Sequence, residues 1–175
     1  MKKMILFLSM LSVLPALSAG NRIPNGDFDQ FDQKTGKAAF WHCSIHQQVV
    51  EEGPGVTPVL RLCAYYRSGK MWKSNTLVKL KNIPAGTYVF SFQARGKASQ
   101  FYFFLNPGKG EKGKKRFIRS FPKLKMKVQE REWRKGEYTL TIPEPMKNAV
   151  ITLEAFFAGK GEYEFIDKVA LVKVK

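Results

Sequence analysis

The densest group of chemically active side chains lies between residues 106 and 127. This stretch holds nine lysine or arginine residues and a single glutamate, Glu111. Clustered cations attract polyanions, among them sulfated or uronic glycans, phosphorylated surface polymers and nucleic acid. The predicted polyanion contacts are Lys112, Lys114, Lys115 and Arg116. The alternative is a solvated loop beside an edge strand that lysines protect against aggregation.

No arrangement of residues predicts an active site. A glycoside hydrolase needs two carboxylates at a controlled separation, and with 14 acidic residues in the chain some pair exists by chance. The sequence also lacks a nucleophile elbow, a phosphate-binding loop and a zinc signature. His42 and His46 share a strand face, but no third metal ligand is nearby. We therefore predict that the protein is not an enzyme.

The first 20 residues have the order of a secretory signal peptide. Two lysines precede an apolar run from residue 4 to about residue 17, and small residues follow at 18–20. A membrane anchor is the alternative, but the run is short for a bilayer span. Cleavage after residue 18, 19 or 20 fits equally well. The rest, residues 21–175, has the length of a single domain and keeps most of the formal net charge of +16.

The two cysteines of the chain, Cys43 and Cys63, are predicted to form a disulfide. An even number of cysteines in an exported protein favours a bridge. The two residues lie on separate predicted strands, which would have to be neighbours. A bridge closing a loop of about 20 residues would contribute on the order of 3 kcal/mol. The alternative is a pair of small buried hydrophobic side chains.

Short runs of alternating apolar and polar residues, separated by Gly, Pro and Lys turns, follow one another along the mature chain. No stretch shows the apolar spacing of three and four that is typical of a helix. Strands are predicted at residues 40–45, 48–51, 58–64, 71–81, 83–95, 100–105, 116–121, 137–142, 149–157 and 163–174. This pattern predicts an all-β fold of two packed antiparallel sheets, a β-sandwich or jelly roll.

The strand at residues 83–95 is the clearest, and it separates a core face from a polar face. Its predicted core residues alternate: Tyr88, Phe90, Phe92 and Ala94. The opposite face carries Gln93 and Arg95. Thr152 and Glu154 are expected on the equivalent face of another strand. Such a polar row can bind a ligand, or it can be an ordinary solvated sheet face.

Four motifs occur in a fixed order along the chain. They are residues 25–29 (NGDFD), residues 83–92 (IPAGTYVFSF), Trp133 followed by residues 138–143 (YTLTIP), and residues 165–171 (FIDKVAL). In this order the sequence resembles the carbohydrate-binding modules of the galactose-binding-like jelly-roll fold, which accompany many secreted glycanases. The motifs span nearly the whole mature chain. The resemblance implies a non-catalytic module that holds its ligand on the concave face of one sheet or at the loop tips.

Aromatic side chains bind sugars because a flat ring stacks on the apolar face of a pyranose, while nearby polar groups bond the hydroxyls. Similar sequences use tryptophan as core at the positions of Trp41 and Trp133. Trp72 follows a loop with Tyr65 and Tyr66, in a region where related modules often place residues that face the ligand. We therefore predict ring contacts from Trp72, Tyr65 and Tyr66, with packing in the core as the alternative for Trp72.

The polar contacts of this expected site are predicted to come from Gln93 and Arg95. Related modules also often hold a structural calcium where the N-terminal acidic motif meets the C-terminal one. The matching positions are Asp29 and Asp167, with Asp27 nearby. Carboxylates and backbone carbonyls are suitable calcium ligands. The chain departs from the family pattern at Lys168, where a second acidic residue is usual and where a positive charge opposes a cation.

Together these features predict a secreted or periplasmic, non-catalytic carbohydrate-binding module, with an anionic polysaccharide as a possible ligand. The alternative is an envelope-associated structural β-sandwich that contacts protein or polyanion without recognising a sugar. No feature predicts a specific nucleic-acid partner, a transmembrane segment after signal cleavage or a particular oligomeric state.

Overall fold

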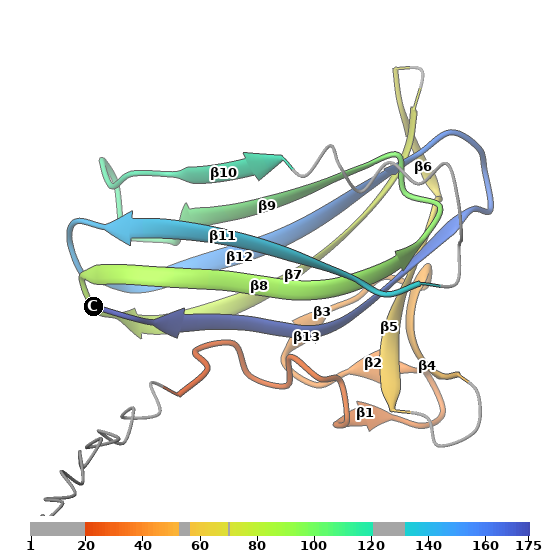
Figure 1. Ribbon diagram of the computed structural model, residues 1–175, viewed down its shortest axis with the longest axis horizontal. Coiled ribbons are helices and arrows are strands. Elements are labelled where there is room, and N and C mark those ends of the chain that lie inside the picture. The colour runs from red at the N-terminus through yellow and green to blue at the C-terminus, as the bar shows by residue number, and fades with distance from the viewer. Residues whose placement is uncertain (1–19, 53–56, 70, 121–131) are drawn as a thin grey trace, which may run out of the picture.

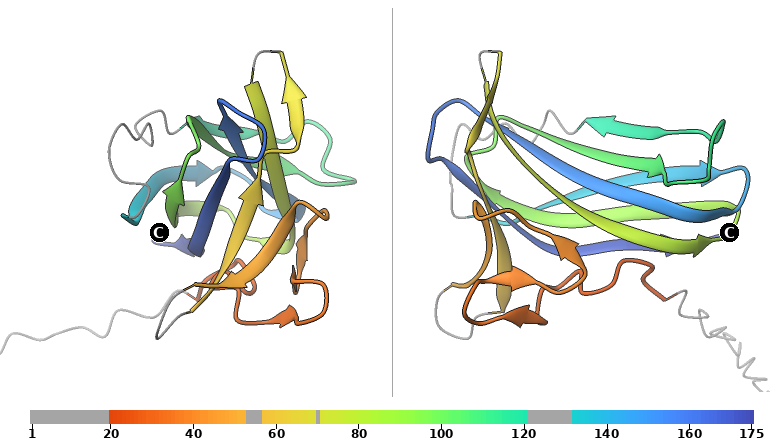
Figure 2. Two further views of the ribbon diagram at one scale, coloured as in Figure 1. Left: turned by 90° about the vertical axis from the view of Figure 1, so that its right-hand side faces the viewer. Right: turned by 180° about the vertical axis from the view of Figure 1, so that it is seen from behind.

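In a computed structural model, the protein is an antiparallel β-sandwich (Figures 1 and 2). The structure describes residues 20–52, 57–69, 71–120 and 132–175, and these ranges contain no helix. The strands are β1 (Phe31–Asp32), β2 (Lys37–Ala38), β3 (Trp41–His42), β4 (Gln47–Glu51), β5 (Pro58–Cys63), β6 (Tyr66–Ser68), β7 (Met71–Ile83), β8 (Gly86–Gly96), β9 (Gln100–Pro107), β10 (Phe117–Ser120), β11 (Arg134–Ile142), β12 (Met146–Phe157) and β13 (Tyr163–Lys173). The predicted signal peptide lies almost entirely outside the described residues.

Two large sheets form the sandwich, as the alternating sequence pattern predicted. The six-stranded sheet has the order β10-β9-β12-β7-β3, with β6 paired to β7, and the five-stranded sheet has the order β11-β8-β13-β5-β4. All of their strand pairs are antiparallel. A separate pair, β1 and β2, lies beside them. The last strand, β13, occupies the centre of its sheet.

The core lies between the two sheets and contains stacked phenylalanines at its centre. Phe90 on β8 stacks on Phe103 of β9, with ring centroids 3.9 Å apart, and Phe92 stacks on Phe101 at 4.7 Å. All four rings are buried. Since β8 and β9 belong to different sheets, these contacts join the layers, and the predicted core face of β8 is confirmed.

The N-terminal segment is fixed to β13 by backbone and side-chain hydrogen bonds. Asn21 donates from Nδ2 to the Val169 carbonyl (3.0 Å), and its Oδ1 accepts from the Leu171 N–H (2.9 Å). Gly26 packs so closely here that a Cβ atom would lie 1.9 Å from the Val169 carbonyl oxygen. This contact explains the glycine of the sequence NGDFD, because any side chain would push the segment off the strand.

Most predicted strands are present, with two changes near the candidate ligand contacts. The predicted loop with Tyr65 and Tyr66 contains β6, which forms a hairpin with the start of β7 that projects beyond the sandwich (Figures 1 and 2). The first predicted strand, at residues 40–45, shortens to β3. Trp41 is in the core as predicted, and its Nε1 donates to the Asn25 carbonyl (3.1 Å).

Candidate functional site

The outer face of the six-stranded sheet combines aromatic rings with polar side chains. Because side chains alternate along a strand, β7, β9 and β12 each turn every second residue away from the core. The register aligns these residues in rows across the sheet (strands visible from behind in Figure 2). Three rows run Tyr66–Lys73–Phe156–Gln100, then Asn75–Glu154–Tyr102, then Leu77–Thr152–Phe104. The outward-facing side chains of neighbouring strands therefore lie directly beside one another across the sheet.

Three rings form one contiguous aromatic surface on this face. The Tyr102 ring centroid lies 5.9 Å from that of Phe104, nearly parallel to it, and 5.5 Å from that of Phe156 at an angle of 73°. All three residues are half-buried. Tyr66, which is 54% exposed, adds a fourth ring beyond Lys73. The rings offer an apolar surface on which an amphipathic ligand can stack.

Polar groups flank the rings on β7 and β12. Lys73 Nζ forms an ion pair with Glu154 Oε1 at 2.7 Å. The same ammonium lies 5.5 Å from the Tyr66 ring centroid and 6.0 Å from that of Phe156. In the next row, the Tyr65 hydroxyl donates to Asn75 Oδ1 (3.0 Å). These contacts fix the orientation of charged and amide groups directly beside the aromatic surface.

The basic loop between β9 and β10 reaches this face through Arg116. The Arg116 guanidinium carbon lies 5.1 Å from the Phe104 ring centroid. Arg116 is exposed, as are Lys112 and Lys115. Lys115 also contacts the Phe117 ring, at 5.4 Å. Arg116 therefore presents a cation beside the aromatic surface, and Lys112 and Lys115 are exposed on the same loop.

The fourth predicted polyanion residue, Lys114, has a structural role instead. Its ammonium pairs with Glu111 Oε2 at 2.7 Å and donates to the Pro145 carbonyl. Glu111 is buried, and its Oε1 accepts the Lys147 N–H (2.7 Å) and the Asn148 N–H (3.1 Å). The pair of Lys114 and Glu111 therefore fixes the basic loop to the start of β12, and Lys114 is not free to bind a ligand.

Of the predicted ring contacts, the structure places Tyr65 and Tyr66 on this face but not Trp72. Trp72 packs against the hydrophobic core, on the side of β7 opposite Lys73. The two residues are adjacent on one strand, so their side chains point to opposite faces. The residue beside Tyr66 on this outer face is therefore Lys73, and its aromatic neighbour is Phe156 on β12.

Gln93 and Arg95 lie on the outer face of the other sheet and do not join the site. The Arg95 guanidinium carbon lies 5.0 Å from the ring centroids of both Trp133 and Phe165, and Arg95 pairs with Glu52. Trp133 is 37% exposed, so its predicted place in the core is wrong. The expectation that Gln93, Arg95 and Glu154 share one polar face fails because β8 and β12 belong to different sheets.

The predicted disulfide is not formed, because Cys43 and Cys63 are both free thiols. Cys43 follows β3 of the six-stranded sheet, packs against the core and lies 3.6 Å from Thr76 Oγ1. Cys63 ends β5 of the five-stranded sheet, so the two strands are not neighbours. Burial raises the pKa of the Cys43 thiol, so the thiol stays protonated and packs as a small hydrophobic side chain.

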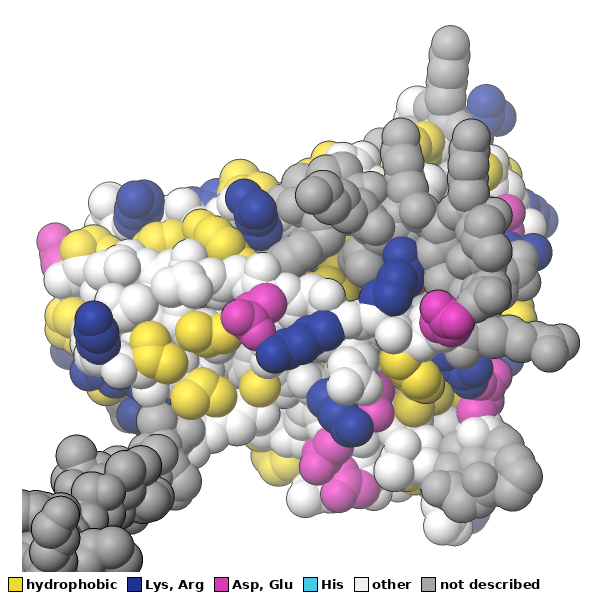
Figure 3. Space-filling model, in the orientation of Figure 1, with side chains coloured by type: hydrophobic (Ala, Val, Ile, Leu, Met, Phe, Trp, Pro, Cys, Tyr) yellow, Lys and Arg dark blue, Asp and Glu magenta, His cyan; other side chains and the backbone are white. Residues whose placement is uncertain are grey.

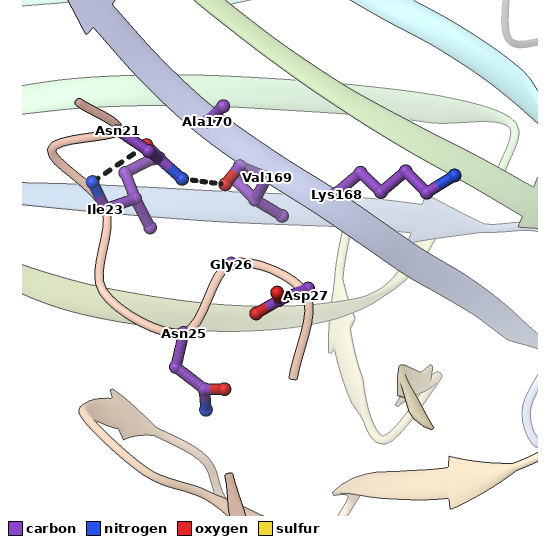
Figure 4. A pocket seen from close by; sticks show the side chains of 8 residues that line it. All are labelled: Asn21, Ile23, Asn25, Gly26, Asp27, Lys168, Val169 and Ala170. Carbon is purple, nitrogen blue, oxygen red and sulfur yellow. Dashed lines mark hydrogen bonds between the residues drawn. The ribbon is translucent and has the colours of Figure 1, made fainter. Parts of the chain in front are cut away.

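The three aspartates of the predicted calcium site lie near one another where the N-terminal segment meets β13. Asp29 raises the pKa of Asp27, while burial, followed by the charges of Asp27 and Asp29, raises the pKa of Asp167. Asp27 and Lys168 also border a pocket of about 400 Å³ (Figure 4). The carboxylates are the right ligand type, but in the described ranges no group of three or more His, Cys, Asp or Glu side chains is arranged to hold a metal. Calcium remains a prediction.

Sequence reasoning missed Tyr102, Phe104, Phe156 and Lys73. A signal was present, because residues 100–105 carry apolar side chains on both faces of their strand. Only one of these faces can meet the core of a two-layer sandwich, so the other is available for a ligand. Phe156 gives a similar signal, because it is an aromatic residue on the face of β12 opposite the core residues.

No protein-family model matches the sequence, and no curated protein matches it either. Solved structures, however, share its architecture. A family 61 carbohydrate-binding module in complex with β-1,4-galactotriose superposes with a TM-score of 0.61 and 17% identity, over 88% of this chain and 99% of that chain. The protein has the jelly-roll fold of carbohydrate-binding modules.

In two further solved structures the matching jelly-roll domain is one part of a longer chain. The N-terminal tandem of family 22 modules from Paenibacillus barcinonensis Xyn10C has a TM-score of 0.58 and 12% identity, covering 92% of this chain and 51% of that chain. An arabinose-bound α-L-arabinofuranosidase has a TM-score of 0.59 and 14% identity, but the match covers 88% of this chain and only 26% of the enzyme. Within the part of this chain that the structure describes, no helix is long and apolar enough to cross a membrane.

Proposed function

We propose that the protein is a secreted or periplasmic, non-catalytic carbohydrate-binding module that holds an anionic glycan on the outer face of the six-stranded sheet. The observation that carries the proposal is the aromatic surface of Tyr102, Phe104 and Phe156 on a jelly-roll sheet. Its rings would stack on the apolar faces of successive sugar units, while Lys73, Glu154 and Asn75 bond their hydroxyl groups.

The size of the face supports a chain of several sugars as ligand. From β3 to β10 the sheet spans four strand spacings, or about 19 Å. The rings of this face lie on β9 and β12, in the middle of that span, with the Tyr66 ring beyond β7. A ligand lying across the strands would therefore contact rings at its centre and polar groups on both sides.

Charge supports an anionic ligand. Arg116 lies over Phe104, and Lys112 and Lys115 are exposed on the same loop. On the strands of this face, Glu154 is the single carboxylate among the described residues, and Lys73 neutralises it. A glycoside hydrolase would need a second carboxylate facing the ligand, so the geometry supports binding rather than hydrolysis.

A glycan array with the mature protein, followed by calorimetry on the best ligand, tests the proposal. Tyr102→Ala should lower the affinity by roughly tenfold or more, because a ring of this size contributes about 1.5–3 kcal/mol when its surface is covered. The matched control is Trp133→Ala, which removes an exposed ring from the opposite sheet and should leave affinity unchanged. If no glycan binds, the envelope-associated structural alternative gains; if both variants bind normally, the ligand lies elsewhere.

A further inference from the structure

A separate pocket adjoins the aromatic face at the edge of the six-stranded sheet, beside β3. Its volume is about 460 Å³, and its lining residues are Phe40, Trp41, His42, Leu77 and Lys79. Leu77 shares a row with Thr152 and Phe104. Two strand spacings, about 10 Å, separate Leu77 from Phe104. A ligand chain lying along this row would therefore enter the pocket when it crosses β7.

Phe40 presents its ring to solvent in a conformation that bulky side chains rarely adopt. Its φ angle is +67°, in the left-handed region, and the side chain is 65% exposed. For a residue with a Cβ atom this conformation is strained. Packing does not explain a strained backbone that holds an aromatic ring in solvent, and such backbone outliers concentrate at ligand-binding positions.

Lys79 supplies a cation with no ion-pair partner among the described residues. It is exposed on the row of Val150 and Asn106, two residues along β7 from Leu77. Lys73, on the same strand face, is by contrast neutralised by Glu154 at 2.7 Å. His42, opposite Leu77 on β3, adds a polar ring. The pocket thus combines a ring, an unpaired ammonium and an imidazole.

We propose that this pocket is a subsite for one acidic sugar unit at the β3 end of the bound glycan. The Phe40 ring stacks on the apolar side of the sugar, and Lys79 pairs with its carboxylate or sulfate group. His42 bonds a ring hydroxyl. The inference rests on the proposed function, because the rest of the ligand lies on the aromatic face. It adds that charge is recognised at a defined position, in addition to the general attraction of the basic loop.

The test compares two pairs of ligands by calorimetry: an oligogalacturonate with its methyl ester, and a sulfated oligosaccharide with its neutral parent. Lys79→Gln should weaken the binding of an anionic member by roughly tenfold and that of its neutral counterpart by less than about twofold. The matched control is Lys81→Gln, two residues along the same face and outside the pocket, which should change neither. The pair that responds identifies the acidic group as carboxylate or sulfate.

Phe40→Gly separates binding from folding. Glycine adopts a positive φ without strain, so the variant should unfold at the same temperature as the wild type or higher, yet bind the anionic ligand roughly tenfold more weakly. Unchanged affinity in Phe40→Gly, or equal effects of Lys79→Gln and Lys81→Gln, would overturn the subsite. If Tyr102→Ala still weakens binding in that case, the proposed function stands and only the subsite fails. If no ligand of either pair binds and Tyr102→Ala has no effect, both proposals fail.

Discussion

The outer faces of the two sheets both combine aromatic rings with cationic side chains, but they arrange them differently. On the five-stranded sheet, Arg95 lies 5.0 Å from the rings of both Trp133 and Phe165. On the six-stranded sheet, the Tyr102 ring contacts neighbouring rings. A single guanidinium therefore contacts both rings of the first face. On the second face Arg116 lies near Phe104 and Lys73 near Phe156, but the three rings also contact one another in series and form a continuous aromatic surface.

The charged side chains of the two faces also differ in how they are paired. On the side of the molecule seen in Figure 3, which includes β8, β11 and β13, basic and acidic side chains lie next to each other. Arg95 pairs with Glu52, and Lys135 pairs with Glu137 at 2.6 Å. The six-stranded face has Glu154 as its one carboxylate on the described strands, with Lys79 and Arg116 exposed around it. The comparison indicates that a count of rings or charges does not locate a binding face, because what matters is whether the rings form one continuous surface and whether the cations are already paired with carboxylates.

The largest expected effect concerns Glu164, under the five-stranded sheet. The side chain is buried, its Oε2 accepts the Ala98 N–H (2.9 Å), and its Oε1 has no hydrogen-bond partner in the described structure. Burial raises the pKa of Glu164 to about 7, although the charge of Arg134 opposes the shift. Since the folded state binds the proton more tightly than the unfolded state, stability falls as pH rises from about 4.5 to about 7.

Glu164→Gln should therefore be more stable than the wild type at pH 8, by about 3 kcal/mol at most, and similar to it near pH 4. Urea denaturation at several pH values measures this difference. Glycan affinity should be unaffected, because the residue lies in the sandwich interior. A constant stability difference across the pH range would show that the carboxyl does not titrate in this window.

Arg95→Ala tests the five-stranded face directly. The variant loses two cation–ring contacts and leaves Glu52 without its cation, so the free energy of unfolding should fall by about 1–2 kcal/mol. Affinity for the glycan should change by less than about twofold, because the two faces lie on opposite sides of the core. A large loss of affinity would reverse the assignment of the two faces.

The basic loop should contribute to polyanion binding through three of its four predicted residues. Replacing Lys112, Lys115 and Arg116 by glutamine should weaken retention on heparin by roughly tenfold, and salt should abolish retention because screening limits exposed charges to about 8 Å at physiological ionic strength. The matched control replaces three exposed lysines elsewhere: Lys34, Lys37 and Lys160. Equal losses in both sets would mean that only net charge matters.

Lys114→Gln sharpens this loop prediction. Because Lys114 pairs with Glu111 and the Pro145 carbonyl, its replacement should lower the unfolding temperature and change heparin retention no more than one control lysine does. Thermal unfolding and salt elution, measured on the same sample, separate the two effects. A loss of retention without a loss of stability would return Lys114 to the ligand-binding group.

The smallest expected effect is that of calcium. Asp29 raises the pKa of Asp27, and the charges of both help to raise that of Asp167, so a cation among them should relieve repulsion and raise the unfolding temperature by about 2–4 °C at millimolar calcium. Asp29→Asn should remove this response, and magnesium serves as the control ion. Without metal, neutralising Asp29 should itself stabilise the protein slightly at neutral pH. An unchanged unfolding temperature in calcium would exclude a structural site here.

The sequence was sufficient to predict the layers but not which strands share a layer. Alternation along β8 correctly predicted that Phe90 and Phe92 are buried, since a period of two depends only on local geometry. Strand pairing depends on the whole chain. Gln93 and Glu154 therefore appeared equivalent, although β8 and β12 belong to different sheets. The disulfide prediction failed for the same reason.

The direction of the Trp72 side chain could have been predicted from the alternation of residues along its own strand. Lys73, Lys79 and Lys81 occupy alternate positions of β7 and identify its outer face, so Trp72 must face inward. Tyr65 could be located only from the structure, because it precedes β6 and its hydroxyl bonds Asn75 across the hairpin. Loop residues of this kind have no periodicity from which their direction follows.

The central position of β13 also determines the order in which the protein can fold. The strand is the last of the chain, yet it pairs with β8 on one side and β5 on the other, and it holds the N-terminal segment through contacts between residues about 150 positions apart, such as Asn21 and Leu171. The five-stranded sheet cannot close before residues 163–173 have been synthesised. Until these residues pair, β8 and β5 lack the strand that lies between them, and long-range pairing of this kind makes this step of folding slow.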